Sequence, residues 1–217
     1  MKLDLDKLKE IQKELAKQIN LDSKIKEIKI ITGFDVAYTR DKLICASASL
    51  DFNSLALIEK KYLITDIKFP YISGFLAFRE GQPIIELFEK IEKKPDIIMV
   101  NGHGIAHELK CGLATYVGVT LKVPTIGIAT RLHVGIIKEG KIIVSNEHRG
   151  YELSSKEKAK PLYISPGNLI SPEDAFEIAK KCIRHPHKLP EPLHIAHRLA
   201  TKKKKKLFPT DKVEEEA

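Results

Sequence analysis

The chain has 217 residues, of which 43% are hydrophobic and 30% are charged. That balance excludes a disordered chain and predicts a globular fold with a buried core. No apolar run approaches the roughly 20 residues that a membrane-spanning helix needs. The first residues, Met1 to Asp4, carry acids without an apolar segment behind them, so we expect neither a membrane contact nor a secretory signal.

The net charge is +8, from 37 basic and 29 acidic residues. An excess of this sign favours a polyanionic partner such as nucleic acid, because neutralised phosphates release counterions, but a lysine-rich solvated surface has the same composition. Part of the excess is local, in the run from Lys202 to Lys206, which Glu214 to Glu216 partly offset. We expect a monomer with one domain over residues 1–200 and a charged tail over residues 201–217.

The three cysteines, Cys45, Cys111 and Cys182, are far apart and form no C-x-x-C pair. Their odd number argues against a disulfide framework. We expect small core residues in a reducing, cytoplasmic compartment.

The N-terminal third predicts a helix and then three strands. Apolar residues recur at spacings of three and four over residues 3–19, as in an amphipathic helix. Residues 28–38, 44–52 and 54–65 are rich in strand-forming residues and are separated by short polar breaks. They predict an antiparallel meander.

The middle of the chain alternates between the two kinds of element. A helix is predicted around Ile84 to Ile91, with Pro83 in its first turn. Buried strands are predicted at residues 96–100 and 124–130, with a helix at 105–119 between them. This order implies parallel strands joined by a right-handed crossover.

The C-terminal third predicts a hairpin from residues 134–137 and 142–144, a strand at 161–164 and two helices. Ser171 is the cap of the first helix, and the second begins near Pro192. The predicted fold class is therefore α/β: a mixed sheet of three antiparallel strands, then parallel strands, flanked by helices.

Three polar residues interrupt or end apolar runs. Asp35 lies inside a predicted strand, Glu80 closes the stretch that begins at Tyr71, and Asn101 follows a buried strand at its carboxyl end. Open α/β sheets bind ligands at such ends, and carboxylate and amide oxygens suit Mg²⁺. Each residue alone is also compatible with a satisfied polar group at a strand end.

Two further patterns support weaker hypotheses. His103 and His107 have the spacing of a zinc pair on a helix, but no H-E-x-x-H motif and no thiolate cluster accompany them. Gly102 and Gly104 allow either close backbone approach to a ligand or a tight turn. A histidine near a scissile phosphate, such as His194 or His197, can transfer a proton or position water, whereas a surface role is the alternative.

Several ordered motifs carry a family resemblance. The stretch from Pro70 to Glu80 resembles the P-Y-I-P-G-L-L-A-F-R-E signature of endonuclease V, the deoxyinosine-repair nuclease family. The similarity covers residues 28 to 200, and the other matching motifs fall in that family's order: Gly33 to Asp35, Gly102 to His107, Pro124 to Ala129, Ser165 to Gly167 and Leu189 to Pro192.

The resemblance implies a ribonuclease-H-like fold and Mg²⁺- or Mn²⁺-dependent cleavage of DNA at the second phosphodiester bond 3′ to deoxyinosine, leaving a 5′-phosphate. It implies that Asp35 and Glu80 are catalytic metal ligands and that His197 is an active-site histidine. Tyr71 would fill the gap left by the extruded base. The lesion pocket would consist of residues that contact the base largely through their backbone: Gly74, Leu76, Gly102, Gly104, His107 and Gly112.

The chain also departs from the family pattern. Asn101 stands where the family has a third metal-binding Asp, so one negative charge is missing although an amide oxygen can still bind Mg²⁺. Ser73 replaces a Pro, Glu108 and Leu109 replace Pro-Arg, and Thr130 replaces a Lys. Two alternatives therefore stay open: a catalytically impaired relative that binds damaged or structured nucleic acid, and a nuclease for another substrate such as inosine-containing RNA.

Overall fold

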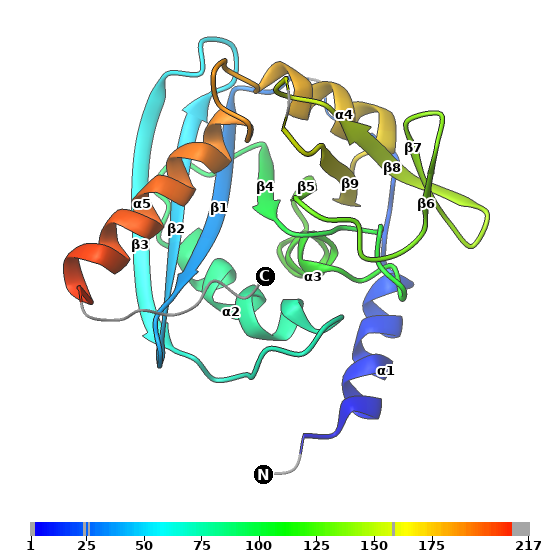
Figure 1. Ribbon diagram of the computed structural model, residues 1–217, viewed down its shortest axis with the longest axis horizontal. Helices are drawn as coiled ribbons and strands as arrows, with labels where there is room; N and C mark the ends of the chain where they lie inside the picture. Colours follow the sequence, from blue (N-terminus) through cyan, green and yellow to red (C-terminus); the bar gives the residue numbers. More distant parts are fainter. Residues whose placement is uncertain (1–2, 24, 26, 158, 210–217) are drawn as a thin grey trace.

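The computed structural model describes residues 3–23, 25, 27–157 and 159–209. Within these residues the chain forms one nine-stranded sheet with helices on both faces (Figure 1). The elements in chain order are α1 (Leu5–Ala16), β1 (Ile30–Tyr38), β2 (Lys42–Asp51), β3 (Leu57–Asp66), α2 (Leu76–Glu89), β4 (Ile97–Asn101), α3 (Leu113–Leu121), β5 (Thr125–Ala129), β6 (Ile136–Lys138), β7 (Lys141–Val144), β8 (Glu147–Leu153), β9 (Leu162–Asn168), α4 (Pro172–Lys181) and α5 (Glu191–Leu207).

The strand order is β3-β2-β1-β4-β5-β9-β8-β7-β6. β1 pairs antiparallel with β2 and parallel with β4, and β4 pairs parallel with β5. The predicted meander, the parallel pair and the mixed sheet are therefore confirmed. From β9 to β6 the sheet continues with antiparallel strands only.

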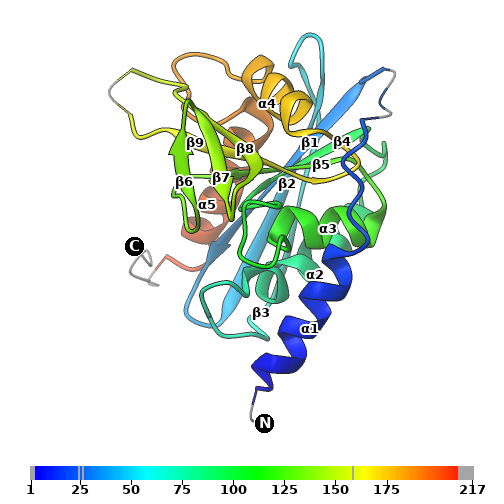
Figure 2. The same cartoon turned by 90° about the vertical axis from the view of Figure 1, so that its right-hand side faces the viewer.

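Helix α1 packs beside α3 at the edge of the molecule, and Figure 2 shows the two helices side by side. Its buried face differs from the predicted apolar stripe. Leu5 and Ile11 are exposed, whereas the amide side chain of Gln12 is only 1% exposed. The apolar spacing predicted the helix correctly but did not predict which face is buried.

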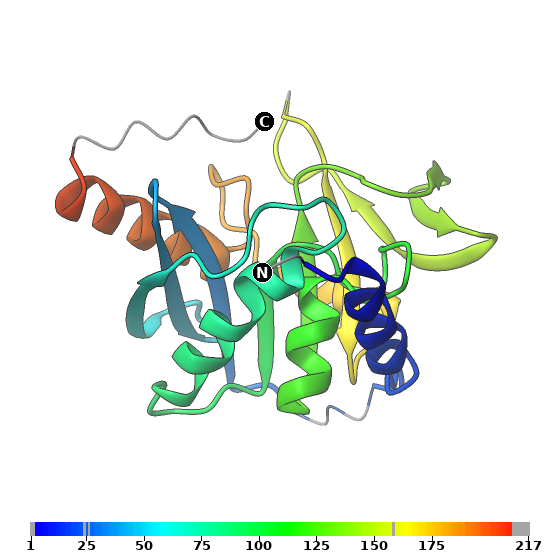
Figure 3. The ribbon, with the colours of Figure 1, turned by 90° about the horizontal axis from the view of Figure 1, so that it is seen from below.

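The two faces of the sheet have separate cores. Phe34, Ile98 and Val100 pack against α2 and α3, whereas Ile31 and Met99 lie on the other face, toward α4 and α5. Figure 3 shows α5 on the opposite side of the strands from α2 and α3. Because side chains alternate along a strand, the residues next to Phe34, namely Gly33 and Asp35, face α5.

Gly33 allows α5 to lie against β1. A Cβ at this position would be 2.4 Å from the carbonyl carbon of Pro192, so any larger residue would push the first turn of α5 away from the sheet. This close approach fixes the position of the helix residues that follow Pro192.

The helix predicted at residues 105–119 begins only at Leu113. The preceding segment folds back on itself as a loop, since the backbone N–H of Gly112 donates to the carbonyl of Gly104. A Cβ on Gly112 would lie 2.3 Å from the carbonyl oxygen of His103, so the loop depends on glycine there. His103 and His107 therefore do not share a helix face, and the premise of a zinc pair is wrong.

Three other elements differ from the predictions. α2 begins at Leu76, so Pro83 lies inside the helix, and the missing N–H costs one helical bond. β8 was not predicted, because its sequence is polar and contains Gly150. α5 continues through Lys202 to Lys206, since lysine forms helices well and its charge is favourable at a helix C-terminus. Residues 210–217 of the expected tail lie outside the described residues.

The three cysteines are free and buried, as predicted. Among the described helices, none is long and apolar enough to cross a bilayer.

Candidate active site

Asp35 is the centre of a hydrogen-bonded group of side chains. Its side chain is only 4% exposed, and both of its oxygens accept hydrogen bonds. Asn101 Nδ2 donates to Oδ1 at 2.7 Å, and His197 Nδ1 donates to Oδ2 at 2.8 Å. The His197 side chain is 53% exposed, so Asp35 orients an imidazole that remains accessible to a ligand.

The fold explains why these residues meet. The parallel register of β1 and β4 aligns Phe34 with Val100, which places Asn101 beside Asp35 at the carboxyl end of β4. The close contact of α5 with Gly33 brings His197 to the same point one and a half turns later. A helix and two strands from distant parts of the chain thus converge on one carboxylate.

Glu80, on α2, is 7% exposed. The Tyr38 hydroxyl donates a hydrogen bond to Glu80 Oε1. Burial raises the pKa of Glu80 to about 8, and the negative charge of Asp35 adds to the rise, while the Tyr38 hydrogen bond and the charge of Arg79 oppose it. The charge of Asp35 contributes to the raised pKa of Glu80, so the two carboxyls are close enough to interact electrostatically.

The donor set fits a hard divalent cation. Mg²⁺ needs only one or two protein carboxylates, since water and substrate oxygens complete its shell. Asp35 and Glu80 would supply the carboxylates, and Asn101, whose Nδ2 donates to Asp35, carries an amide oxygen as a further hard donor. A cation would also offset the cost of ionising the buried Glu80. The set has only two carboxylates, and no larger group of three or more His, Cys, Asp or Glu side chains suited to a metal occurs within the described residues, so water and substrate oxygens would have to complete the shell.

A pocket of about 570 Å³ opens beside Asn101. Most of the residues predicted for a lesion pocket line it, whereas Gly104 does not. Gly104 instead packs against the backbone, because a Cβ there would lie 2.0 Å from the carbonyl oxygen of Pro166. Tyr71 stands at the pocket and is 50% exposed. The other predicted residues that line the pocket are Gly74, Leu76, Gly102, His107 and Gly112.

Gln12, which the sequence analysis missed, holds two walls of this pocket together. Its Nε2 donates to the carbonyl of Gly74 at 2.9 Å and to the carbonyl of Cys111 at 3.1 Å. The Gly74 carbonyl also accepts from His107 Nε2 at 3.0 Å. The turn after Tyr71 is therefore fixed by two donors. The available signal was a polar residue four positions after Leu8, inside the helix's apolar spacing.

Burial lowers the pKa of two histidines at the pocket. Burial lowers the pKa of His107, whose Nδ1 accepts from the Leu109 N–H. Burial, reinforced by the charge of His133, lowers the pKa of His103 to about 4. His103 Nε2 donates to the Arg131 carbonyl at 2.9 Å, and its buried Nδ1 has no hydrogen-bond partner in the described part of the chain.

The sequence pattern of the Endonuclease V family matches residues 13–198. The chain is 36% identical over 220 residues to Endonuclease V of Archaeoglobus fulgidus, which covers 98% of this chain and 99% of the relative. Its fold matches Endonuclease V from Bacillus subtilis with a TM-score of 0.83 at 32% identity, covering 95% of each chain. It also matches Ciona intestinalis Endonuclease V in complex with a 24mer DNA containing an inosine followed by a ribo-adenosine, with a TM-score of 0.85 and 26% identity, covering 94% of this chain and 98% of that one.

The mixed sheet, with buried carboxyls and a pocket at the ends of its parallel strands, defines the class of ribonuclease-H-like nucleases. Within that class the chain belongs to the Endonuclease V family. The predicted family and fold are therefore confirmed.

Proposed function

We propose that this protein is a divalent-metal-dependent endonuclease that cleaves DNA at the second phosphodiester bond 3′ to deoxyinosine. The observation that carries the proposal is the position of Asp35, which accepts hydrogen bonds from Asn101 and His197 beside a pocket lined by Tyr71. Reactive groups and a base-sized cavity thus adjoin each other. The DNA complex of the Ciona intestinalis relative, in which the DNA contains an inosine, supports the choice of substrate.

Each side chain has a role that follows from its surroundings. Asp35 and Glu80 would hold the cation, with the amide oxygen of Asn101 as a weaker ligand. A bound cation would neutralise charge at the scissile phosphate and lower the pKa of a bound water. His197, oriented by Asp35, would position water or transfer a proton. Tyr71 would replace the stacking of the base that enters the pocket.

The test is a nicking assay on a duplex with one deoxyinosine, with the same duplex containing deoxyadenosine as the control substrate. Wild-type protein should nick only the inosine strand, in Mg²⁺ or Mn²⁺ and not in EDTA. Asp35→Ala should abolish the nick. Equal nicking by the wild-type protein and Asp35→Ala would remove the assignment.

A second candidate function is binding without cleavage. It is favoured by Asn101, which stands where the family has an Asp. The proposed cation site therefore has one negative charge fewer than the family pattern, and the Asn101 amide donates to Asp35. Tyr71-dependent binding of the inosine duplex, with no nick in Mg²⁺ or Mn²⁺, would establish this reading. The same assay with an inosine-containing RNA strand tests the remaining substrate class.

A further inference from the structure

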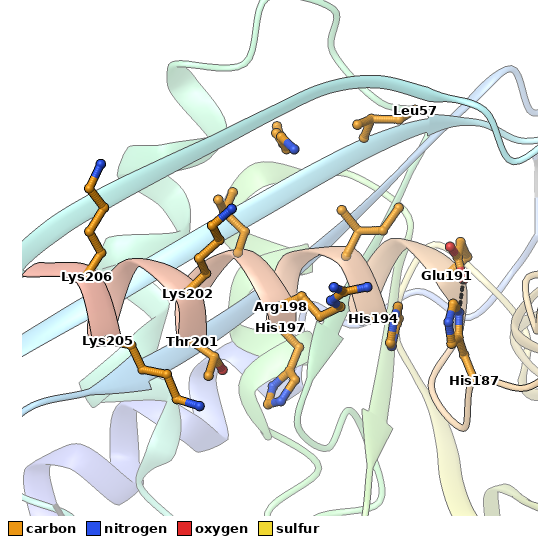
Figure 4. Close-up of a pocket in the computed structure, with 13 residues that line it drawn as sticks. Leu57, His187, Glu191, His194, His197, Arg198, Thr201, Lys202, Lys205 and Lys206 are labelled. Atoms are coloured by element: carbon orange, nitrogen blue, oxygen red, sulfur yellow. Dashed lines mark hydrogen bonds and ion pairs between the residues drawn. The ribbon is translucent and has the colours of Figure 1, made fainter. Parts of the chain in front are cut away.

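A groove runs along the exposed side of α5, between this helix and β3. Its volume is about 1070 Å³. Figure 4 shows the side chains that line it. Leu57 and Lys60 line it from β3, and residues of α5 from Glu191 to Lys206 line the other side. The groove lies outside the pocket described above, with which it shares no lining residue.

The groove is cationic. Five basic side chains line it, and none of them forms an ion pair with a carboxylate in the described part of the chain: Lys60, Arg198, Lys202, Lys205 and Lys206. Glu191 is the carboxylate that lines the groove, and it is already paired with His187, whose Nδ1 lies 2.7 Å from Glu191 Oε2 (Figure 4). Lysines in the last turn complement the helix macrodipole, but that effect does not explain Arg198 or a lysine from β3. Clustered positive charge of this kind attracts a polyanion.

The groove is continuous with the proposed reaction centre, which is the group formed by Asp35, Asn101 and His197. His197, Thr201 and Lys205 project from the same side of α5 in Figure 4, and His197 is the residue that bonds Asp35. Lys205 follows His197 by eight residues. At 1.5 Å per helical residue this separation is about 12 Å, which corresponds to about three or four nucleotides of a duplex whose axis runs along α5.

The direction along the strand follows from the sheet order. Asp35 is on β1, the pocket lies toward β4 and β5, and α5 packs on β1 and β2. A strand with its base in the pocket must therefore cross Asp35 before it reaches the lysines. This step rests on the proposed function, in which the cut lies 3′ to the base in the pocket.

We propose that the α5 groove binds the phosphodiester backbone of the cleaved strand on the 3′ side of the cut. Lys202 and Lys205 neutralise phosphates beyond the scissile bond and hold the strand that carries the new 5′-phosphate. The contacts are with phosphate, so they add affinity without adding base selectivity.

The test compares the double variant Lys202→Gln/Lys205→Gln with Lys93→Gln/Lys122→Gln. The control removes the same charge from exposed lysines in the segments that precede β4 and β5, at the opposite end of these strands. Binding to fluorescent inosine duplexes is measured by anisotropy in EDTA over a salt series. One duplex ends at the expected cut, and the other extends twelve nucleotides further on that side.

On the long duplex, the groove variant should lower the slope of log K against log salt by about 1.4–1.8, the value for two phosphate contacts, with the control unchanged. On the short duplex, wild type and groove variant should bind alike. Equal binding of the long duplex by the groove variant and wild type, or an equal loss on both duplexes, would overturn the proposal. Binding in EDTA is independent of nicking, so a failure of the proposed cleavage reaction is seen separately.

Discussion

The proposed reaction centre around Asp35 and the adjoining pocket are built in different ways. At the reaction centre, side chains hold side chains, as Asn101 and His197 hold Asp35. At the pocket, backbone packs against backbone at Gly112, and side-chain donors hold carbonyl oxygens, as Gln12 does. The first region should be sensitive to charge, and the second to volume and to the loss of a donor. Substitutions that change one property at a time can separate the two regions.

The largest effect is expected at the reaction centre, from Glu80→Gln. In the proposed mechanism Glu80 is a cation ligand, and the neutral amide would weaken it, so nicking should fall by about a hundred- to a thousandfold. The folded pKa of Glu80 is about 8 against an ordinary 4.5, so between these values the unfolded chain has lost a proton that the folded protein keeps. The free energy of unfolding of the wild-type protein, measured in EDTA, should therefore fall by about 5 kcal/mol as the pH rises from 4.5 to 8.

Urea unfolding of wild type and Glu80→Gln at several pH values measures this contribution. The variant should be the more stable protein at pH 8 and should lack the decline. A variant with low activity and an unchanged pH profile would show that Glu80 is not a buried, coupled carboxyl.

The pocket should show the opposite pH dependence through His103. Its folded pKa of about 4 lies below the ordinary 6.5, so the unfolded chain binds a proton first as the pH falls. Stability should therefore decrease from pH 6.5 to 4, by about 3 kcal/mol. His103→Gln should remove this decline, whereas His133→Asn should reduce it only slightly, because burial is the larger cause. An identical acid limb in wild type and His103→Gln would contradict the prediction.

Gln12→Glu tests the donor that joins the pocket walls. A carboxylate cannot donate to the carbonyls of Gly74 and Cys111, and we expect a loss of about 2 kcal/mol in stability. The turn that carries Tyr71 should also become less fixed, so KM for the inosine duplex should rise more than kcat falls. The matched control is Gln18→Glu near the end of the same helix, where the exposed side chain donates only to the Glu14 carbonyl. Equal kinetics for the two variants would limit Gln12 to a structural role.

The smallest effect is expected from Asn101→Asp, which sharpens the comparison at the reaction centre. A second carboxylate would face Asp35 Oδ1, where an N–H now donates at 2.7 Å. Affinity for Mg²⁺ or Mn²⁺ should rise about tenfold, or about 1.4 kcal/mol, and the metal-free protein should become less stable. Calorimetric titration with Mn²⁺ measures the affinity without relying on nicking. An unchanged titration would count against Asn101 as a ligand.

Much of the architecture could be read from local patterns. Apolar spacing predicted the meander, the parallel pair and most helices, because burial of one face imposes a period on the sequence. Polar interruptions of apolar runs also indicated Asp35, Glu80 and Asn101. The loop before Leu113 was misread as helix, because the backbone contact between Gly112 and His103 depends on packing that no local period records.

Side-chain chemistry, by contrast, depended on contacts between distant segments. Asp35 and His197 are 162 positions apart, and Gln12 is 99 positions from the Cys111 carbonyl that it bonds. The raised pKa of Glu80 likewise comes from burial and from a carboxylate on another element. Periodicity and motif order fix which elements form, since those depend on near neighbours. Which groups share a proton, a hydrogen bond or a cation depends on how close the packed elements bring them.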